Sequence, residues 1–167
     1  MRIVSFYFIF LMTLLSCNKE DIVGGTMSVT GGYNIMIVDN GENISSYIEK
    51  DVQLFFRDDK GTEILYYNPN LQSPYGINYY DTKDPYLNII AFDLSKTDSL
   101  IQNSTKQEQI HKSDMVLKYF DKTLKIQSQI AYTNTYIVIN EIIINGKKLY
   151  DRYTNKQETI LIDYKSL

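Results

Sequence analysis

The sequence predicts an all-β domain in which short antiparallel strands form a sandwich of two sheets. Apolar and polar residues alternate over many short stretches, and turn signals containing glycine, asparagine or proline separate those stretches. No stretch has the apolar spacing of a long amphipathic helix. About eight strands of this kind are typical of an antiparallel β-sandwich, and a small closed β-barrel is the alternative that the same pattern allows.

The first part of the domain is expected to contain an apolar strand and a hairpin. The run 33–38 is apolar and ends at Asp39-Asn40-Gly41, a strong turn signal. In the stretch 52–57 every second residue is apolar on one face, which predicts a half-buried strand. The turn 58–61 ends in a glycine, and the segment 63–67 is predicted to return antiparallel to the first strand.

The middle of the domain is expected to be less regular. All three prolines fall in the segment 68–86, so only a short edge strand over 77–80 is predicted there. The stretch 86–94 regains the character of a strand. The segment 95–113 is polar, and we expect a loop with at most one helical turn.

The C-terminal third has the clearest strand pattern. Strands are predicted over 115–120, 124–132, 136–144, 147–150 and 160–164. Asp121-Lys122 and Asn145-Gly146 supply the tight turns, the second of them of type I′. The strand over 136–144 is apolar on both faces except at Asn140 and Glu141, which predicts a central strand covered on two sides.

The N-terminus has the features of a secretory signal peptide. Met1 and Arg2 carry positive charge, and the run 3–15 is almost entirely apolar. A membrane-spanning helix needs about 20 apolar residues, so this run is too short to cross a bilayer. We therefore expect export followed by removal of residues 1–16.

The end of the apolar run resembles the lipobox of bacterial lipoproteins. Leu14-Leu15-Ser16-Cys17 has a branched apolar residue at −3 and a small residue at −1, and Cys17 is the only cysteine in the chain. The resemblance implies cleavage before Cys17 and acylation of its thiol. Several acyl chains at one residue give stable membrane anchoring. The alternative is a free or buried thiol.

The residues that follow also carry a resemblance. Lys19-Glu20-Asp21 resembles the surface-export signal of Bacteroidetes lipoproteins, which implies an outer-membrane location facing the medium. An ordinary charged tether explains the same three residues. The strand layout is similar to the immunoglobulin-like or transthyretin-like sandwiches of small Bacteroidetes envelope lipoproteins. The polar, glycine-bearing composition after Cys17 predicts a lipidated, flexible tether over 17–32, and the length of the mature chain predicts a single sandwich domain over 33–167.

Composition argues against several classes of function. Removing Arg2 with the signal peptide changes the net charge of −3 to −4, so no basic excess is present for nucleic acid. One histidine and an acylated cysteine cannot assemble the usual zinc ligands. Neither a G-x-S-x-G elbow nor a glycine-rich nucleotide loop occurs, so no catalytic residue, metal or cofactor is assigned.

Three residues or segments with chemical potential are given ordinary structural interpretations. His111 is expected to be solvated in the polar loop. The acidic segment 58–63 is interpreted as a hairpin turn and not as a calcium site, because its spacing does not fit an EF-hand. Glu141 is expected at a bulge or strand end, where its carboxylate reaches water.

The strongest candidate for recognition is a segment rich in tyrosine and asparagine. Its candidate binding residues are Tyr66, Tyr67, Tyr75, Tyr79, Tyr80 and Tyr86, with Asn68, Asn78 and Asp81 among them. Such residues combine rigid rings with adaptable hydrogen bonds, and rings of this kind bind proteins or glycans; packing over the rim of the sandwich is the alternative. We expect a non-catalytic envelope lipoprotein that presents a binding or assembly surface. The alternatives are a pilin-like or transport-complex structural subunit and a small carboxylate-dependent hydrolase.

Overall fold

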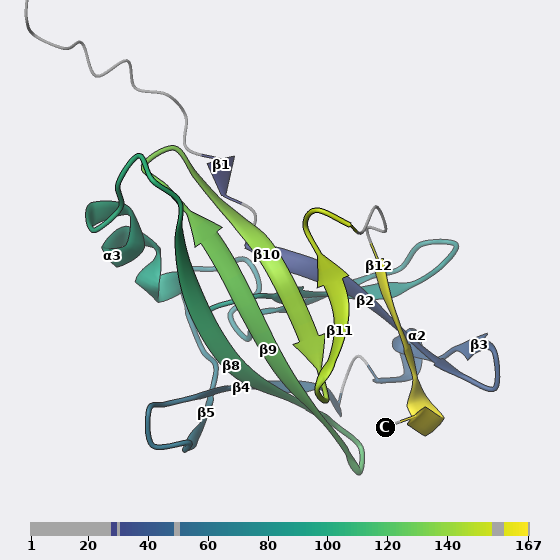
Figure 1. The fold of residues 1–167 in the computed structure, drawn as a ribbon. Coiled ribbons are helices and arrows are strands. Elements are labelled where there is room, and N and C mark those ends of the chain that lie inside the picture. Colours follow the sequence, from purple (N-terminus) through teal and green to yellow (C-terminus); the bar gives the residue numbers. More distant parts are fainter. Residues whose placement is uncertain (1–27, 30, 49–50, 155–158, 167) are drawn as a thin grey trace, which may run out of the picture.

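The computed structural model describes residues 28–29, 31–48, 51–154 and 159–166 (Figure 1). The strands are β1 (Ser28–Val29), β2 (Gly32–Asp39), β3 (Glu42–Asn43), β4 (Gln53–Arg57), β5 (Glu63–Leu65), β6 (Ile77–Tyr80), β7 (Tyr86–Ile90), β8 (Gln109–Tyr119), β9 (Lys122–Tyr132), β10 (Tyr136–Ile144), β11 (Lys147–Asp151) and β12 (Thr159–Asp163). The helical segments are α2 (Ser45–Ile48), α3 (Thr97–Gln102) and the 3-10 turns η2 (Leu94–Lys96) and η3 (Tyr164–Ser166). None of the helices in these ranges has the length and apolar character needed to cross a membrane.

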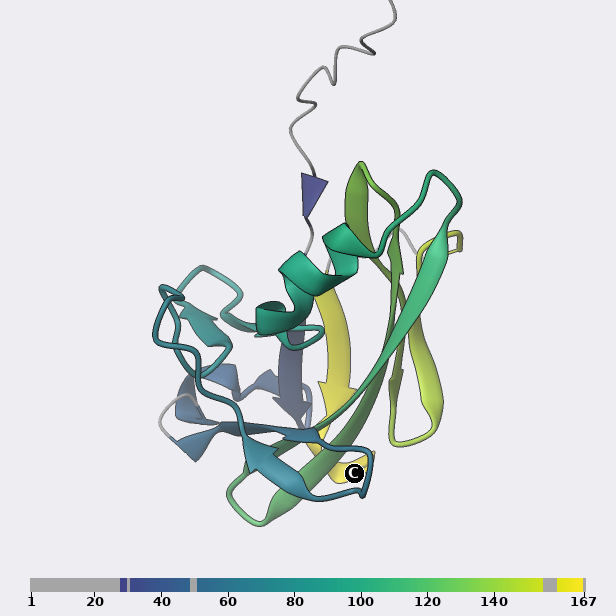
Figure 2. The same ribbon diagram turned by 90° about the vertical axis from the view of Figure 1, so that its left-hand side faces the viewer.

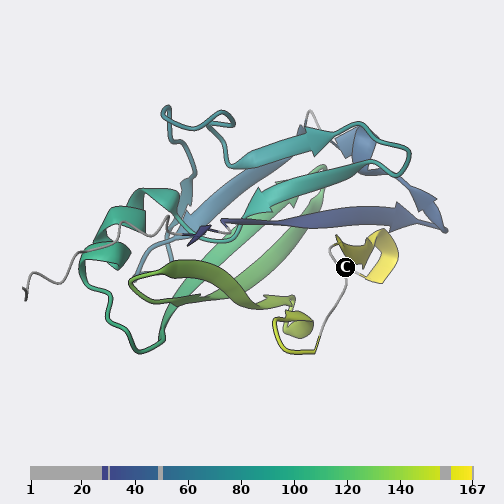
Figure 3. The ribbon, with the colours of Figure 1, turned by 90° about the horizontal axis from the view of Figure 1, so that it is seen from above.

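The strands form two sheets, which confirms the predicted all-β sandwich. Sheet A has the order β1-β10-β9-β8-β4-β5, with β11 paired to β10 beside β1. Sheet B has the order β12-β2-β7-β6, with β3 paired to β2. Most neighbours are antiparallel, whereas β1 with β10 and β12 with β2 are parallel pairs. Seen from above, β2 and β7 of sheet B run at an angle to β9 of sheet A (Figure 3).

Both sheets are open in the part of the chain that the structure describes. No strand pairing joins sheet A to sheet B there, so the small closed β-barrel, which the sequence pattern also allowed, does not describe this fold. On one side of the sandwich the terminal strands are β5 in sheet A and β6 in sheet B. Helix α3 lies toward the same end of the molecule as β1 (Figure 2).

The core follows directly from the alternation of residues along the strands. In β2, Tyr33, Ile35 and Ile37 are buried, while the residues between them are half-exposed. Strand β9 buries every second residue over most of its length in the same way. Fully burying a side chain such as isoleucine contributes about 1.5–3 kcal/mol, so the matched alternation of the two sheets fixes which face of each turns inward.

The turn predicted at 39–41 and the type I′ turn predicted at Asn145-Gly146 are confirmed. Asn40 and Gly41, and likewise Asn145 and Gly146, have positive φ values between 49° and 84°. The turn between β8 and β9 differs from the prediction by one residue. Tyr119 pairs with Lys122, so the turn is formed by Phe120 and Asp121, and Phe120 has φ of 47°.

Several element boundaries differ from the sequence prediction. Strand β8 begins at Gln109, so residues 109–113 are strand and not loop as predicted. The polar segment contains more helix than the single turn expected, because η2 (3 residues) continues directly into α3 (6 residues). Strand β12 ends at Asp163, and Tyr164 begins a 3-10 turn. Strand β1 lies inside the segment expected to be a tether.

Strand β10 is central in sheet A, but only one of its faces is fully buried. Its inner residues, such as Ile137 and Ile142, are buried, whereas the outer ones are half-exposed, so the prediction of cover on two sides is wrong. The register with β9 shifts between Ile139 and Glu141, which places Glu141 at a bulge, as predicted. Its carboxylate accepts a hydrogen bond from Gln129 (3.0 Å) and forms an ion pair with Lys148.

Candidate binding surfaces

The structure divides the tyrosine-rich segment between the interior and the surface. Tyr66 is only 6% exposed, and its ring lies 5.2 Å from that of Phe56. Tyr79 is half-buried on the inner face of β6, where it pairs with Leu87 of β7. These two tyrosines therefore pack in the sandwich, which is the alternative given for the segment. The other four tyrosines lie at the surface in two pairs.

The first pair belongs to a surface at the free edge of sheet A. The rings of Tyr67 and Tyr75 are 5.4 Å apart, and the two residues are 58% and 55% exposed. Ile64 and Leu65 of β5 are 56% and 44% exposed beside them. We call these four residues the edge surface. A contiguous exposed apolar patch is typical of an interaction site.

Two clefts flank the edge surface. The larger, of about 660 Å³, lies between β5 with the chain that follows it and the η2–α3 segment, and its rim carries Arg57, Asp58, Asp93 and Lys96. The smaller, of about 460 Å³, lies between the β4–β5 and β6–β7 pairs. It is lined by Val52, Gln53, Leu54, Leu65, Tyr75, Ile77, Tyr79 and Leu87. Leu65 lines both clefts, so the edge surface lies between them. Charged residues occur at the larger cleft, and none of the described residues that line the smaller one is charged.

The backbone of β5 has a free side at this surface. The N–H of Tyr66 donates to the carbonyl of Leu54 (2.8 Å), and the carbonyl of Thr62 accepts from Asp58 (3.1 Å), so these groups point toward β4. In an antiparallel ladder the alternate residues, Glu63 and Leu65, direct their N–H and C=O groups the other way. Within the described ranges no strand pairs with that side of β5.

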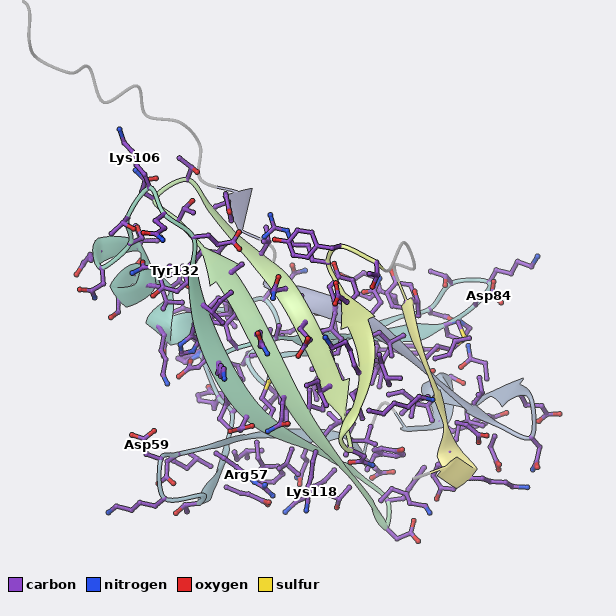
Figure 4. The ribbon with its side chains drawn as sticks, in the orientation of Figure 1. Arg57, Asp59, Asp84, Lys106, Lys118 and Tyr132 are labelled. Carbon is purple, nitrogen blue, oxygen red and sulfur yellow. The ribbon has the colours of Figure 1, made fainter. Side chains whose placement is uncertain are left out.

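The only charged residue of β5 is engaged on the opposite side of the strand. The Glu63 carboxylate forms ion pairs with Arg57 (2.9 Å) and Lys118 (2.7 Å), which reach it from β4 and β8 (Figure 4). The hydrogen bonds from these two cations, that from Lys118 first, lower the pKa of Glu63. Edge strands are often protected by free charges, and here the charge is directed across the sheet instead.

The second tyrosine pair lies on the outer face of sheet B. Tyr80 of β6 pairs with Tyr86 of β7, and their rings stack at 5.0 Å with an angle of 15° between their planes. Asn78, two residues before Tyr80, lies on the same face and pairs with Asn88. The exposed tyrosines of the predicted binding loop therefore belong to two separate surfaces. Tyr67 and Tyr75 lie beside apolar residues of β5, whereas Tyr80 and Tyr86 lie beside asparagines on sheet B.

His111 is not solvated in a loop, contrary to the prediction. It belongs to β8, on the face that packs toward sheet B, and its ring lies edge-on to Phe92 at 6.3 Å. Burial lowers the pKa of His111; the positive charge of Lys96 lowers it further, and Asp93 opposes the shift. The inward residues at the start of β8, Gln109, His111 and Ser113, are polar, so the alternation that indicates a half-buried strand is missing there.

The acidic residues near the larger cleft have structural roles. Asp58 accepts hydrogen bonds from the N–H groups of Lys60 (2.9 Å) and Thr62 (2.8 Å), as expected for the predicted hairpin turn. Asp93 accepts from the N–H (3.0 Å) and hydroxyl (2.7 Å) of Ser95, which lies in η2. Within the described part of the chain, no three His, Cys, Asp or Glu residues cluster so as to hold a metal ion.

The predicted lipidation site Cys17 and the export signal Lys19, Glu20 and Asp21 lie outside the described residues, so they stay predictions. Comparisons of the chain with known protein families, with curated proteins and with solved structures found no match.

Proposed function

We propose that this chain is a non-catalytic lipoprotein of the cell envelope, anchored in the outer membrane through Cys17, that binds a partner polypeptide at the edge surface. The observation that carries the proposal is the free side of β5, where unpaired backbone groups, exposed apolar side chains and two clefts occur together. An extended polypeptide satisfies all three features, because its backbone pairs with the edge and its alternate side chains enter pockets on either side.

The position of the edge surface is consistent with a tethered protein. The described chain begins at β1, and Figures 1 and 2 show β1 at one end of the sandwich and β5 near the other. A tether attached at the β1 end would leave the β5 end as the part of the domain farther from the attachment point. A partner in the medium or on a neighbouring envelope protein would then have access to it.

The same edge supports a second candidate function. In a pilin-like or transport-complex subunit, the added strand would come from another subunit of the assembly. The free edge favours this function over that of the small hydrolase. A hydrolase would need available carboxylates, and Asp58 and Asp93 of the larger cleft instead accept hydrogen bonds that fix their own turns. The two binding functions differ in the source of the strand.

Two substitutions at one position test the role of the backbone. Leu65→Pro removes an N–H that points away from β4, so it blocks strand addition while the β4–β5 ladder is kept. Leu65→Ala removes the side chain and keeps the N–H. Tyr47→Ser, at an exposed tyrosine on α2, is the matched control.

The probe is a display library of random 12-residue peptides, with circular dichroism as the check on folding. We expect the wild type and the Tyr47→Ser protein to enrich peptides with alternating apolar residues. Leu65→Ala should weaken the binding of these peptides, and Leu65→Pro should abolish it. Binding that survives in Leu65→Pro, or the absence of any enriched peptide, contradicts the proposal. Light scattering separates the two sources: self-association that Leu65→Pro removes indicates a structural subunit.

A further inference from the structure

The outer faces of the two sheets differ in charge. On sheet A, the outer positions include the charged residues Lys112, Asp114, Lys118, Lys125, Glu141 and Lys148. On sheet B, the charged residue Asp163 occupies the outer position at the end of β12, but a block of eight outer positions on four neighbouring strands has no charge. It consists of Asn34, Met36, Asn78, Tyr80, Tyr86, Asn88, Thr159 and Leu161, and we call it the neutral face. All eight are half-exposed or exposed, so the lack of charge is not a result of burial.

One row of the neutral face consists of amide and hydroxyl side chains. Asn78 pairs with Asn88, Asn88 with Asn34, and Asn34 with Thr159, so the row crosses β6, β7, β2 and β12. The amide of Asn88 donates to the Oδ1 of Asn34 (2.8 Å), and the hydroxyl of Ser73 donates to Asn78. Among the described residues, the Nδ2 donors of Asn34 and Asn78 have no protein acceptor, so they remain able to bind a ligand.

A glycine keeps this row open. A Cβ added at Gly32 would lie 2.9 Å from the Oδ1 of Asn88 and 3.1 Å from the carbonyl of Ile89. A larger residue at this position would displace the Asn88 amide from the row. The arrangement of the amides therefore depends on the missing side chain.

The adjacent row is aromatic and apolar. Tyr80 and Tyr86 stack, and each ring uses only one of its faces in that contact. Extending the β2–β7 register by one residue places Met36 opposite Tyr86, and Met36 pairs with Leu161 of β12. Tyr80 is 43% exposed and Leu161 57%. The neutral face thus has an apolar row directly beside a hydrogen-bonding row.

We propose that the neutral face binds an uncharged polysaccharide. A sugar ring combines an apolar C–H face with a rim of hydroxyl groups, and it therefore matches an aromatic row beside an amide row. Four strands at a spacing of about 4.8 Å give the rows a length of about 14 Å, which suits an extended chain of sugars rather than a small molecule. The lack of charge over the whole block excludes the complementary pairing that an anionic polysaccharide requires. This site shares no residue with the edge surface.

Affinity electrophoresis in native gels tests the proposal. The gels contain hydroxyethyl cellulose, galactomannan or amylopectin as neutral polysaccharides, and alginate as the anionic one. We expect at least one neutral polysaccharide to retard the wild type and alginate not to retard it. Asn88→Ala removes the centre of the amide row and Tyr80→Ser removes a ring at the free edge of sheet B; each should lower the affinity about tenfold or more, which corresponds to about 1.4 kcal/mol.

Two controls separate this site from other parts of the protein. Ile110→Ser changes an exposed apolar residue on the outer face of sheet A, and Leu65→Pro disables the edge surface; both proteins should be retarded like the wild type. Loss of binding in either control, retardation that persists in both Asn88→Ala and Tyr80→Ser, or no retardation by any of the three neutral polysaccharides overturns the proposal. Because Tyr80 is exposed at a sheet edge, the Tyr80→Ser protein keeps the test valid if Asn88→Ala fails to fold.

Discussion

Replacing Gly76 by alanine should destabilise the fold more than the same replacement at Gly61. Gly76 precedes β6, has φ of 73°, and its carbonyl accepts a hydrogen bond from Ile90 (3.0 Å). A Cβ at this position would lie 2.7 Å from the Cδ1 of Ile90 and 2.9 Å from the Cδ1 of Tyr66, two buried side chains. Gly61 has a similar φ of 79°, but a Cβ added there would meet no atom within 4 Å beyond its chain neighbours.

The two glycines share the backbone cost and differ in the packing cost. A left-handed conformation costs an L-residue about 1–2 kcal/mol, and overpacking a well-filled core costs about 1–3 kcal/mol. Gly61→Ala should therefore lose about 1–2 kcal/mol of unfolding free energy, and Gly76→Ala about 2–5 kcal/mol. The latter is a large share of a typical stability of about 5–15 kcal/mol.

Urea unfolding of the domain, followed by circular dichroism, measures both changes. Equal losses for the two variants would show that Ile90 and Tyr66 accommodate the added methyl group. The inference that the chain before β6 is too closely packed for a side chain at Gly76 would then be wrong. A Gly76→Ala protein as stable as the wild type would refute the argument from φ as well.

Two further predictions concern protonation and processing. Burial lowers the pKa of His111 below its usual 6.5, so as the pH falls through 6.5 the unfolded chain takes up the proton first. The wild type should lose stability between about pH 7 and the lower pKa of the folded state, and urea titrations of His111→Gln should lack this loss; the same pH dependence in both proteins would contradict the assignment. Cys17→Ala should prevent acylation and leave an unprocessed precursor. Labelling of that variant by an alkyne fatty acid would refute the lipobox assignment.

Local chemistry explains which parts of the fold the sequence could predict. The turns at Asn40-Gly41 and Asn145-Gly146 need positive φ at both positions, and asparagine and glycine are the residues that tolerate it. The turn at Phe120 lies one residue away from its predicted position because phenylalanine seldom adopts a positive φ, so its identity gives no turn signal. The start of β8 was also missed, because the residues there do not show the expected alternation.

The inward residues at the start of β8 are polar, and their environment is not local. His111 packs on Phe92, and Ser113 is buried opposite Ser128, whose hydroxyl donates to the carbonyl of Ala91. These partners come from the chain before α3 and from β9. The alternation of apolar and polar residues is therefore missing at the start of β8, because polar inward residues there contact residues that are distant in the sequence.

The candidate surfaces were predictable only in composition. The tyrosine-rich segment indicated recognition, but period-two alternation alone could not show that Tyr66 is buried while Tyr67, just beyond the end of β5, is exposed. Ile64 should share the inner face with Tyr66, yet it is exposed because β5 is the last strand of its sheet. Strand order is a property of distant pairings, and a single segment does not encode it.

The dimensions of β5 limit what the backbone can contribute to binding. Glu63 and Leu65 offer two N–H and two C=O groups on the free side, and each hydrogen bond gives a net of about 0.5–1.5 kcal/mol, or about 2–6 kcal/mol in all. Association costs about 4–15 kcal/mol in lost freedom, so backbone pairing alone does not hold a partner. Each large apolar side chain that enters a cleft adds about 1.5–3 kcal/mol. Stable binding therefore requires the clefts on both sides of Leu65, and the edge selects partners by their alternate side chains as well as by their extended backbone.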